Sequence, residues 1–211
     1  MDIPHFGLYA VAVLLLNITP GNDFIYVATR ALSSGTRGGI ISAFGITAGL
    51  LIHFLASIFG LSLIVAKSVG VYTIIKYIGA GYLIYLGVKI FFSKPLNPME
   101  ISGATARKNS AWIIFRQGFL TNTFNPKVAL FFLSFLPQFA DSHAANYTLQ
   151  LAGLSVWFIF SGTIVNIAIA LLFGRLRIRM KKFSLFWKWQ SKITGTILVM
   201  LGLKIALSQK R

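Results

Sequence analysis

Residues 17–23 read Asn17-Ile18-Thr19-Pro20-Gly21-Asn22-Asp23, and they interrupt a long apolar segment that begins at Phe6. Proline has no backbone N–H donor and its ring clashes with the preceding helical turn, so a helix is broken at Pro20. A carboxylate and two amides stand beside this break, in a segment that is otherwise almost entirely apolar. The stretch therefore predicts a broken helix with polar groups at the point of interruption.

A second break, Asn122-Thr123-Phe124-Asn125-Pro126-Lys127, lies at the matching place in the second half of the chain. Pro20 follows the start of its apolar segment by 14 residues, and Pro126 follows the start of its own segment at Trp112 by the same 14 residues. Paired interruptions in corresponding halves of a membrane protein mark the binding site in many secondary transporters. The spacing therefore predicts two broken helices that meet around a site.

The composition predicts an integral membrane protein with one polytopic domain over residues 1–211. Apolar residues make up 56% of the chain and charged residues 11%, with a mean hydropathy of +0.75. Soluble domains carry about a quarter charged residues. The net charge of +16 is concentrated between the apolar runs, which favours a role in membrane topology and argues against nucleic-acid binding. Cysteine is absent, which excludes disulfides, thiol catalysis and zinc-thiolate sites.

Six apolar segments can be drawn, and all are expected to be helical because isolated strands cannot satisfy their backbone in lipid. The first is expected to be a retained span, since it is too long for a signal peptide and no basic region precedes it. The sixth is short and flanked by lysines. The segments run from Phe6 to Ala31, Ile40 to Ala66, Val71 to Phe92, Trp112 to Phe139, Tyr147 to Phe173 and Ile193 to Leu207.

Lysine and arginine are concentrated in the first, third and fifth loops, which predicts that these loops are cytoplasmic. The fifth loop carries the densest basic cluster, and the fourth has neither residue type. Both termini would then face outward, although Lys210 and Arg211 favour the opposite side for the C-terminus.

A short internal repeat indicates two related halves. Segment three ends in Leu86-Gly87-Val88-Lys89-Ile90, and segment six ends in Leu201-Gly202-Leu203-Lys204-Ile205. Because three spans is an odd number, the halves must cross the membrane in opposite directions. The expected fold is an all-α integral membrane protein of six transmembrane helices in two inverted three-helix repeats, with helices one and four broken. The halves cover about residues 1–93 and 111–208, joined by a linker over 94–110.

Asp23 is the first candidate site residue, because a carboxylate at a helix centre costs about 2.5–3.5 kcal/mol on insertion scales. It either caps the helix that restarts after Gly21 or takes part directly in substrate or proton binding. Lys127 either attracts a substrate carboxylate or snorkels to solvent. Together the two breaks suit a zwitterion, with its ammonium on Asp23 or on backbone carbonyls and its carboxylate on Lys127 or on backbone N–H groups.

The asparagines at the breaks are expected at least to satisfy backbone groups that the prolines free. His53, near the middle of segment two, either carries a proton or forms a hydrogen bond between helices. Gly45 and Gly49 form a GxxxG pattern that is typical of close helix packing. The candidate pathway residues are Asp23, Lys127, Pro20, Gly21, Asn22, Asn17, Asn122, Asn125, Pro126 and His53.

Enzyme signatures are missing from the sequence. It contains no phosphate-binding G-x-x-x-x-G-K-[ST] and no HExxH, and its three histidines are far apart. Four acidic residues leave little for a two-metal or paired-carboxylate site. No metal, cofactor or catalytic residue is therefore expected, and an enzyme that acts on lipid would lack a recognisable nucleophile.

Four stretches together resemble the LysE/RhtB family of bacterial amino-acid exporters. Many relatives have proline where this chain has Asn22, so the first turn differs here. The stretches follow the family's order and spacing along nearly the whole chain, and they are Thr19-Pro20-Gly21-Asn22-Asp23, Gly79-Ala80-Gly81-Tyr82-Leu83-Ile84-Tyr85-Leu86-Gly87, Asn125-Pro126-Lys127 and Phe135-Leu136-Pro137-Gln138-Phe139.

The resemblance implies export of an amino acid or derivative across a bacterial inner membrane, coupled to the proton gradient. Both basic and neutral substrates occur within the family. The scarcity of acidic residues favours a neutral substrate such as homoserine, threonine or a leucine-like molecule. Efflux of an inorganic cation such as cadmium is the alternative function, and a homodimer is left open.

Overall fold

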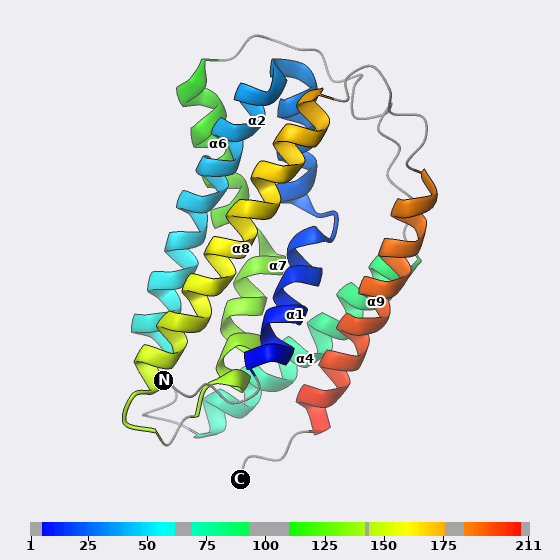
Figure 1. The fold of residues 1–211 in the computed structure, drawn as a ribbon. Helices are drawn as coiled ribbons and strands as arrows, with labels where there is room; N and C mark the ends of the chain where they lie inside the picture. The colour runs from blue at the N-terminus through cyan, green and yellow to red at the C-terminus, as the bar shows by residue number, and fades with distance from the viewer. Residues whose placement is uncertain (1–5, 62–68, 93–109, 142–143, 176–183, 208–211) are drawn as a thin grey trace.

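The computed structural model describes residues 6–61, 69–92, 110–141, 144–175 and 184–207, and within these ranges the chain is helical and contains no strand. The helices form a bundle in which α1 begins and α9 ends at one end, whereas α6 begins and α8 ends at the other (Figure 1). The elements are α1 (Phe6–Ile18), α2 (Asn22–Ala56), the π-helical turn η1 (Ser57–Leu61), α4 (Val69–Phe91), α6 (Ala111–Thr123), α7 (Pro126–Leu130), the π-helical turn η2 (Phe131–Phe135), the 3₁₀ turn η3 (Leu136–Phe139), α8 (Tyr147–Arg175) and α9 (Ser184–Leu207).

Both predicted helix breaks are present. α1 ends at Ile18 and α2 begins at Asn22, so the chain between them contains Pro20 and Gly21. α6 ends at Thr123, and α7 begins with Pro126 at its first position, where the missing N–H has no intrahelical acceptor to lose. The prolines therefore divide the first and fourth apolar segments as the sequence predicts.

The loop expected between the first two segments is replaced by a single-residue turn. α2 runs from Asn22 to Ala56, but Gly35 has φ 73° and ψ −177°, a conformation open to glycine and costly for other residues. Ala31 and Gly39 would be about 12 Å apart along a straight helix. A Cβ placed on Gly39 would instead lie 2.8 Å from the Cβ of Ala31, so the two parts of α2 fold against each other.

Three expected boundaries need correction or fall outside the described residues. The sixth segment begins at Ser184 rather than Ile193, so it is a helix of 24 residues and is not short. The α-helical part of the second segment ends at Ala56, where a π-helical turn follows. Residues 62–66 of that segment and the expected linker over 94–109 lie outside the described residues.

Two of the described helices are long and apolar enough to cross a membrane, Asn22–Gly60 and Tyr147–Arg175. The first of these contains the turn at Gly35, after which residues 36–56 form an unbroken helix. Shorter apolar helices cover Phe6–Ile18, Tyr77–Phe91 and Pro126–Phe139. Length and composition thus agree with a membrane protein.

Close packing between helices depends on glycines. α2 packs against α6 and α8, and α4 packs against α9 (Figure 1). Gly45 and Gly49 bring α2 against the backbone of α6, because their added Cβ atoms would meet Phe115 O and, at 2.7 Å, Phe119 O. The GxxxG pattern in α2 is therefore a packing face, as the sequence predicts.

The α4–α9 pair uses glycines from both helices in the same way. A Cβ on Gly87 would lie 2.7 Å from Gly195 O, and one on Gly195 would lie 2.6 Å from Gly87 O. Farther along the same pair, a Cβ on Gly202 would lie 2.8 Å from Ala80 O. The two helices therefore approach each other backbone to backbone.

An aromatic cluster anchors α1 to the second half of the chain. Tyr9 is fully buried among Phe131, Phe135 and Phe139, with its ring centroid 5.3 Å from that of Phe139. Its hydroxyl donates a hydrogen bond of 3.0 Å to the carbonyl oxygen of Leu154 in α8. This contact fixes α1 beside α8 and so positions the break at its C-terminal end.

Replacing Tyr9 by phenylalanine should lower the free energy of unfolding by about 0.5–1.5 kcal/mol, because one buried hydrogen bond is lost and the ring is kept. The melting temperature of the detergent-solubilised protein measures the change. Tyr85→Phe is the matched control, since that ring is 57% exposed. Equal melting temperatures for the two variants would contradict the expectation.

Candidate functional site

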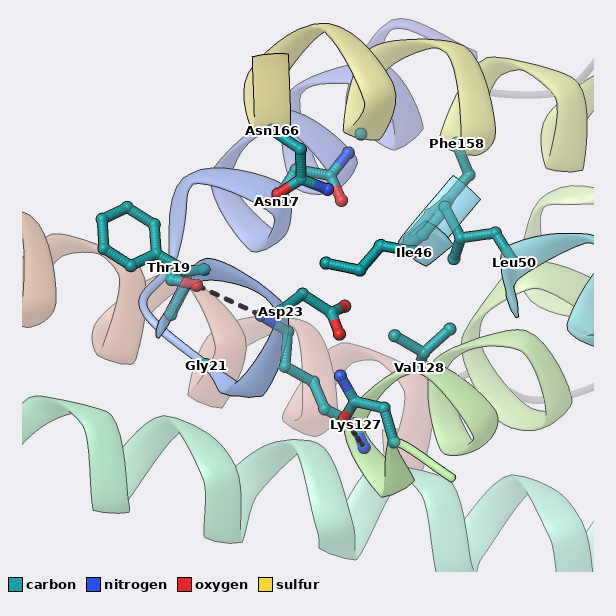
Figure 2. A pocket seen from close by; sticks show the side chains of 13 residues that line it. Asn17, Thr19, Gly21, Asp23, Ile46, Leu50, Lys127, Val128, Phe158 and Asn166 are labelled. Carbon is teal, nitrogen blue, oxygen red and sulfur yellow. Dashed lines mark hydrogen bonds between the residues drawn. The ribbon is translucent and has the colours of Figure 1, made fainter. Parts of the chain in front are cut away.

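A small cavity lies where the two helix breaks meet (Figure 2). Its walls come from the end of α1, the start and middle of α2, the start of α7 and the middle of α8. Its polar side chains belong to Asn17, Thr19, Asp23, Asn125, Lys127 and Asn166. Its apolar side chains belong to Phe24, Ile46, Leu50, Val128 and Phe158. Two breaks that are about a hundred residues apart in sequence thus enclose one site.

At each break, a side chain from another helix donates to the backbone carbonyl oxygen that lies four residues before the proline. In a continuous helix the N–H of residue 20 would bond to Leu16 O, but Pro20 has no N–H. Leu16 O accepts instead from the Thr19 backbone N–H at 3.2 Å and from Lys127 Nζ at 2.9 Å, and Lys127 Nζ also donates to Thr19 O at 3.3 Å. The lysine of the second break therefore caps the C-terminal end of α1, as Figure 2 shows for the bond to Thr19.

A side chain also binds the carbonyl oxygen that lies four residues before the second proline. Asn122 O accepts from the Asn125 backbone N–H at 2.9 Å, and the His53 ring lies with Nε2 3.0 Å from the same oxygen. Because a carbonyl oxygen only accepts, Nε2 of His53 carries the proton. His53 is 8% exposed and packs beside the ring of Phe132. It thus forms an interhelical hydrogen bond, the second of the two roles that the sequence allows for it.

Asp23 joins the two halves through its side chain. Asn122 Nδ2 donates to Asp23 Oδ2 at 2.9 Å, so a residue at the end of α6 holds a carboxylate at the start of α2. The other oxygen, Asp23 Oδ1, is buried and has no hydrogen-bond partner, and the same holds for Asn122 Oδ1. A buried acceptor without a donor is costly, which marks this side of the cavity as a place for a ligand donor, a water or a proton.

The asparagines differ in what they do at the breaks. Asn125 accepts from the Lys127 backbone N–H at 3.1 Å and so caps α7. Asn17 donates to Ser161 Oγ at 3.1 Å and thereby ties the end of α1 to α8. Gly21, the N-cap of α2, offers no side-chain acceptor, which leaves the start of that helix without a side-chain cap.

Of the ten predicted pathway residues, five line the cavity, namely Asn17, Gly21, Asp23, Asn125 and Lys127. Asn122 binds the Asp23 carboxylate and His53 binds Asn122 O, and neither side chain lines the cavity. Pro20, Asn22 and Pro126 shape the breaks without lining the cavity, and Asn22 and Pro126 are exposed.

Several lining residues were not identified from the sequence. Asn166 lines the same cavity as Asn17 (Figure 2), and the sequence marks it only as an amide in the middle of an apolar segment. Thr19 belongs to the first break but is not among the predicted pathway residues. The apolar wall of Ile46, Leu50 and Phe158 carries no signal of its own, because such residues occur throughout the chain.

The cavity is nearly closed in this structure. Its volume is about 20 Å³, which is room for about one water molecule. An organic ligand would need the walls to separate. The described residues contain no group of three or more His, Cys, Asp or Glu side chains that could hold a metal ion.

Comparison with known proteins gives a consistent family assignment. The model of the LysE type translocator family matches residues 14–209. The chain is 35% identical to the uncharacterized membrane protein YrhP of Bacillus subtilis (strain 168), over 95% of this chain and 97% of that protein. It is 28% identical to the leucine efflux protein of Salmonella choleraesuis (strain SC-B67), over 67% of this chain and 66% of that protein. No solved structure shows significant similarity to the chain.

Proposed function

The chain belongs to the LysE type translocator family, and on that premise we propose that it exports a neutral amino acid across the bacterial inner membrane in exchange for protons. The observation that carries the proposal is the cavity between the two helix breaks, which holds a carboxylate from one break and an ammonium from the other. Secondary transporters place their substrates at such broken helices.

The polar groups of the cavity suit the two charges of an amino acid. Asp23 Oδ1 has no partner and offers an acceptor for a substrate ammonium. Lys127 uses two of its three N–H donors on Leu16 O and Thr19 O, which leaves one for a substrate carboxylate. The uncapped start of α2 at Gly21 adds backbone N–H groups and the positive end of a helix dipole.

The apolar wall favours a neutral side chain. Ile46, Leu50 and Phe158 face the same cavity as Asp23, and Asp23 is the only acidic residue among the described residues that line it. A basic amino acid would bring a second cation with no carboxylate to meet it. Its burial would cost on the order of the 2.5–3.5 kcal/mol of a charge in a membrane. The leucine efflux protein among the relatives agrees with an aliphatic substrate.

An inverted repeat is supported by contacts that recur with the two halves exchanged. Aligning Leu86–Ile90 with Leu201–Ile205 makes residues 115 positions apart equivalent. Gly87 and Gly195 then correspond to Gly202 and Ala80, and both pairs are close backbone contacts. We propose that the halves rock about the cavity, opening it alternately to the cytoplasm and to the outside, with the first, third and fifth loops cytoplasmic.

Transport assays in proteoliposomes test the proposal. With an imposed proton gradient, labelled leucine or threonine should leave the vesicles more than about tenfold faster than labelled lysine, because a second buried ammonium lacks a partner. Collapsing the gradient with a protonophore should slow this efflux to the rate seen without a gradient. Faster efflux of lysine would refute the neutral substrate, and efflux that the protonophore does not slow would refute proton exchange.

A further inference from the structure

The C-terminal end of α1 has the properties of a cation site. Pro20 has no N–H to donate to Leu16 O, which accepts from the Thr19 N–H at 3.2 Å instead, and Thr19 O points out of the break toward the cavity. The end of a helix carries a partial negative charge, which adds to the attraction of these two oxygens for a cation. Asp23 Oδ1, buried and without a partner, belongs to the same cavity.

The position of Lys127 in its own helix does not explain its conformation. It is the second residue of α7, and a cation near a helix N-terminus is unfavourable because the helix dipole is positive there. Its side chain leaves that helix and extends to the end of α1, where Nζ lies 2.9 Å from Leu16 O and 3.3 Å from Thr19 O. Gly21 borders this path, since a Cβ there would lie 3.4 Å from Nζ.

We propose that the carbonyl oxygens of Leu16 and Thr19 form a monovalent-cation site that Lys127 fills with its own ammonium. In other transporters with broken helices, carbonyl oxygens at the ends of half-helices coordinate Na⁺. Here the cation is attached to the protein, so the site needs no Na⁺. This inference deepens the proposed transport function, and it rests on that function only where amino-acid efflux is measured.

Removing the tethered ammonium should open the site to free Na⁺. Parent, Lys127→Ala and Lys127→Gln proteins are purified in detergent and melted in sodium chloride or in choline chloride at equal concentration. The melting temperature of Lys127→Ala should be about 3–6 °C higher with Na⁺ at about ten times its dissociation constant, because a ligand of the folded state stabilises it by mass action. The parent should melt at the same temperature in both salts.

Lys89→Ala is the matched control, since it removes an exposed lysine of α4 that lies outside the cavity. The proposal is overturned if Na⁺ raises the melting temperature of Lys127→Ala no more than it raises that of Lys89→Ala. It is also overturned if Na⁺ stabilises the parent protein. Lys127→Gln replaces Lys127→Ala if the alanine variant does not fold. If neither variant folds, the melting temperature of the parent tests the proposal. A parent that melts at a higher temperature in sodium chloride than in choline chloride would contradict a site that Lys127 already fills.

Export by the parent gives the second measurement. Amino-acid efflux should proceed at the same rate with Na⁺ or choline on both sides of the vesicle membrane, and a requirement for Na⁺ would overturn the tethered-cation proposal. A Lys127→Ala protein that gains Na⁺ stabilisation while the parent moves no amino acid would refute the transport function and leave the cation site standing. The two failures are therefore distinguishable.

Discussion

Replacing Asp23 by asparagine should lower amino-acid export by about 10- to 100-fold and remove its dependence on the proton gradient. The substitution keeps the size of the side chain and a bond to Asn122, but it removes the charge that a substrate ammonium or a proton would meet. A hydrogen bond to a charged group contributes about 1.5–3 kcal/mol, and each 1.4 kcal/mol corresponds to about a factor of ten. Asparagine does not titrate, so the dependence of export on the proton gradient should be lost as well.

Efflux from proteoliposomes at several pH values measures both effects. Asp141→Asn is the matched control, because the same chemical change is made at an exposed position outside the cavity. The control should export at the parent rate with the parent's pH dependence. If Asp23→Asn exports as fast as the parent at every pH, Asp23 carries neither the substrate nor the coupling proton.

Replacing Gly45 by alanine should lower the melting temperature by roughly 3–10 °C, a large effect for one added methyl group. The new Cβ would collide with the backbone carbonyl of Phe115 in α6, and a backbone atom cannot move aside as a flexible side chain does. Overpacking of this kind costs about 1–3 kcal/mol, equivalent to about 2–4 °C per kcal/mol for a chain of this length.

Gly81→Ala provides the control for this packing effect. Gly81 also lies inside a helix, but no atom lies within 4 Å of a Cβ added there. Its melting temperature should stay the same or rise slightly, since alanine favours a helix over glycine by about 0.5–1 kcal/mol. Equal destabilisation of the two variants would show that α2 and α6 are not in close contact at Gly45.

Much of the fold can be predicted because membrane insertion leaves few choices. Runs of apolar residues must be helical in lipid, and proline must interrupt them, which places the breaks at Pro20 and Pro126. The helix boundaries that are predicted wrongly lie where charged and apolar residues occur together in the sequence. α9 begins nine residues before Ile193, because lysines and tryptophans near a membrane surface do not end a helix. A tight turn replaces the expected loop at Gly35, since its conformation leaves no signal beyond one glycine.

The sequence by itself determined that the chain is a helical membrane protein, that two helices are broken, and that Asp23 and Lys127 stand beside the breaks. These features depend on local chemistry, which neighbouring residues decide. Only the tertiary structure decided that Lys127 donates to Leu16 O, that His53 donates to Asn122 O, and that Asn166, Ile46 and Leu50 complete the cavity. Such pairings join residues from different helices, and which faces meet follows from the packing of the whole bundle rather than from any one segment.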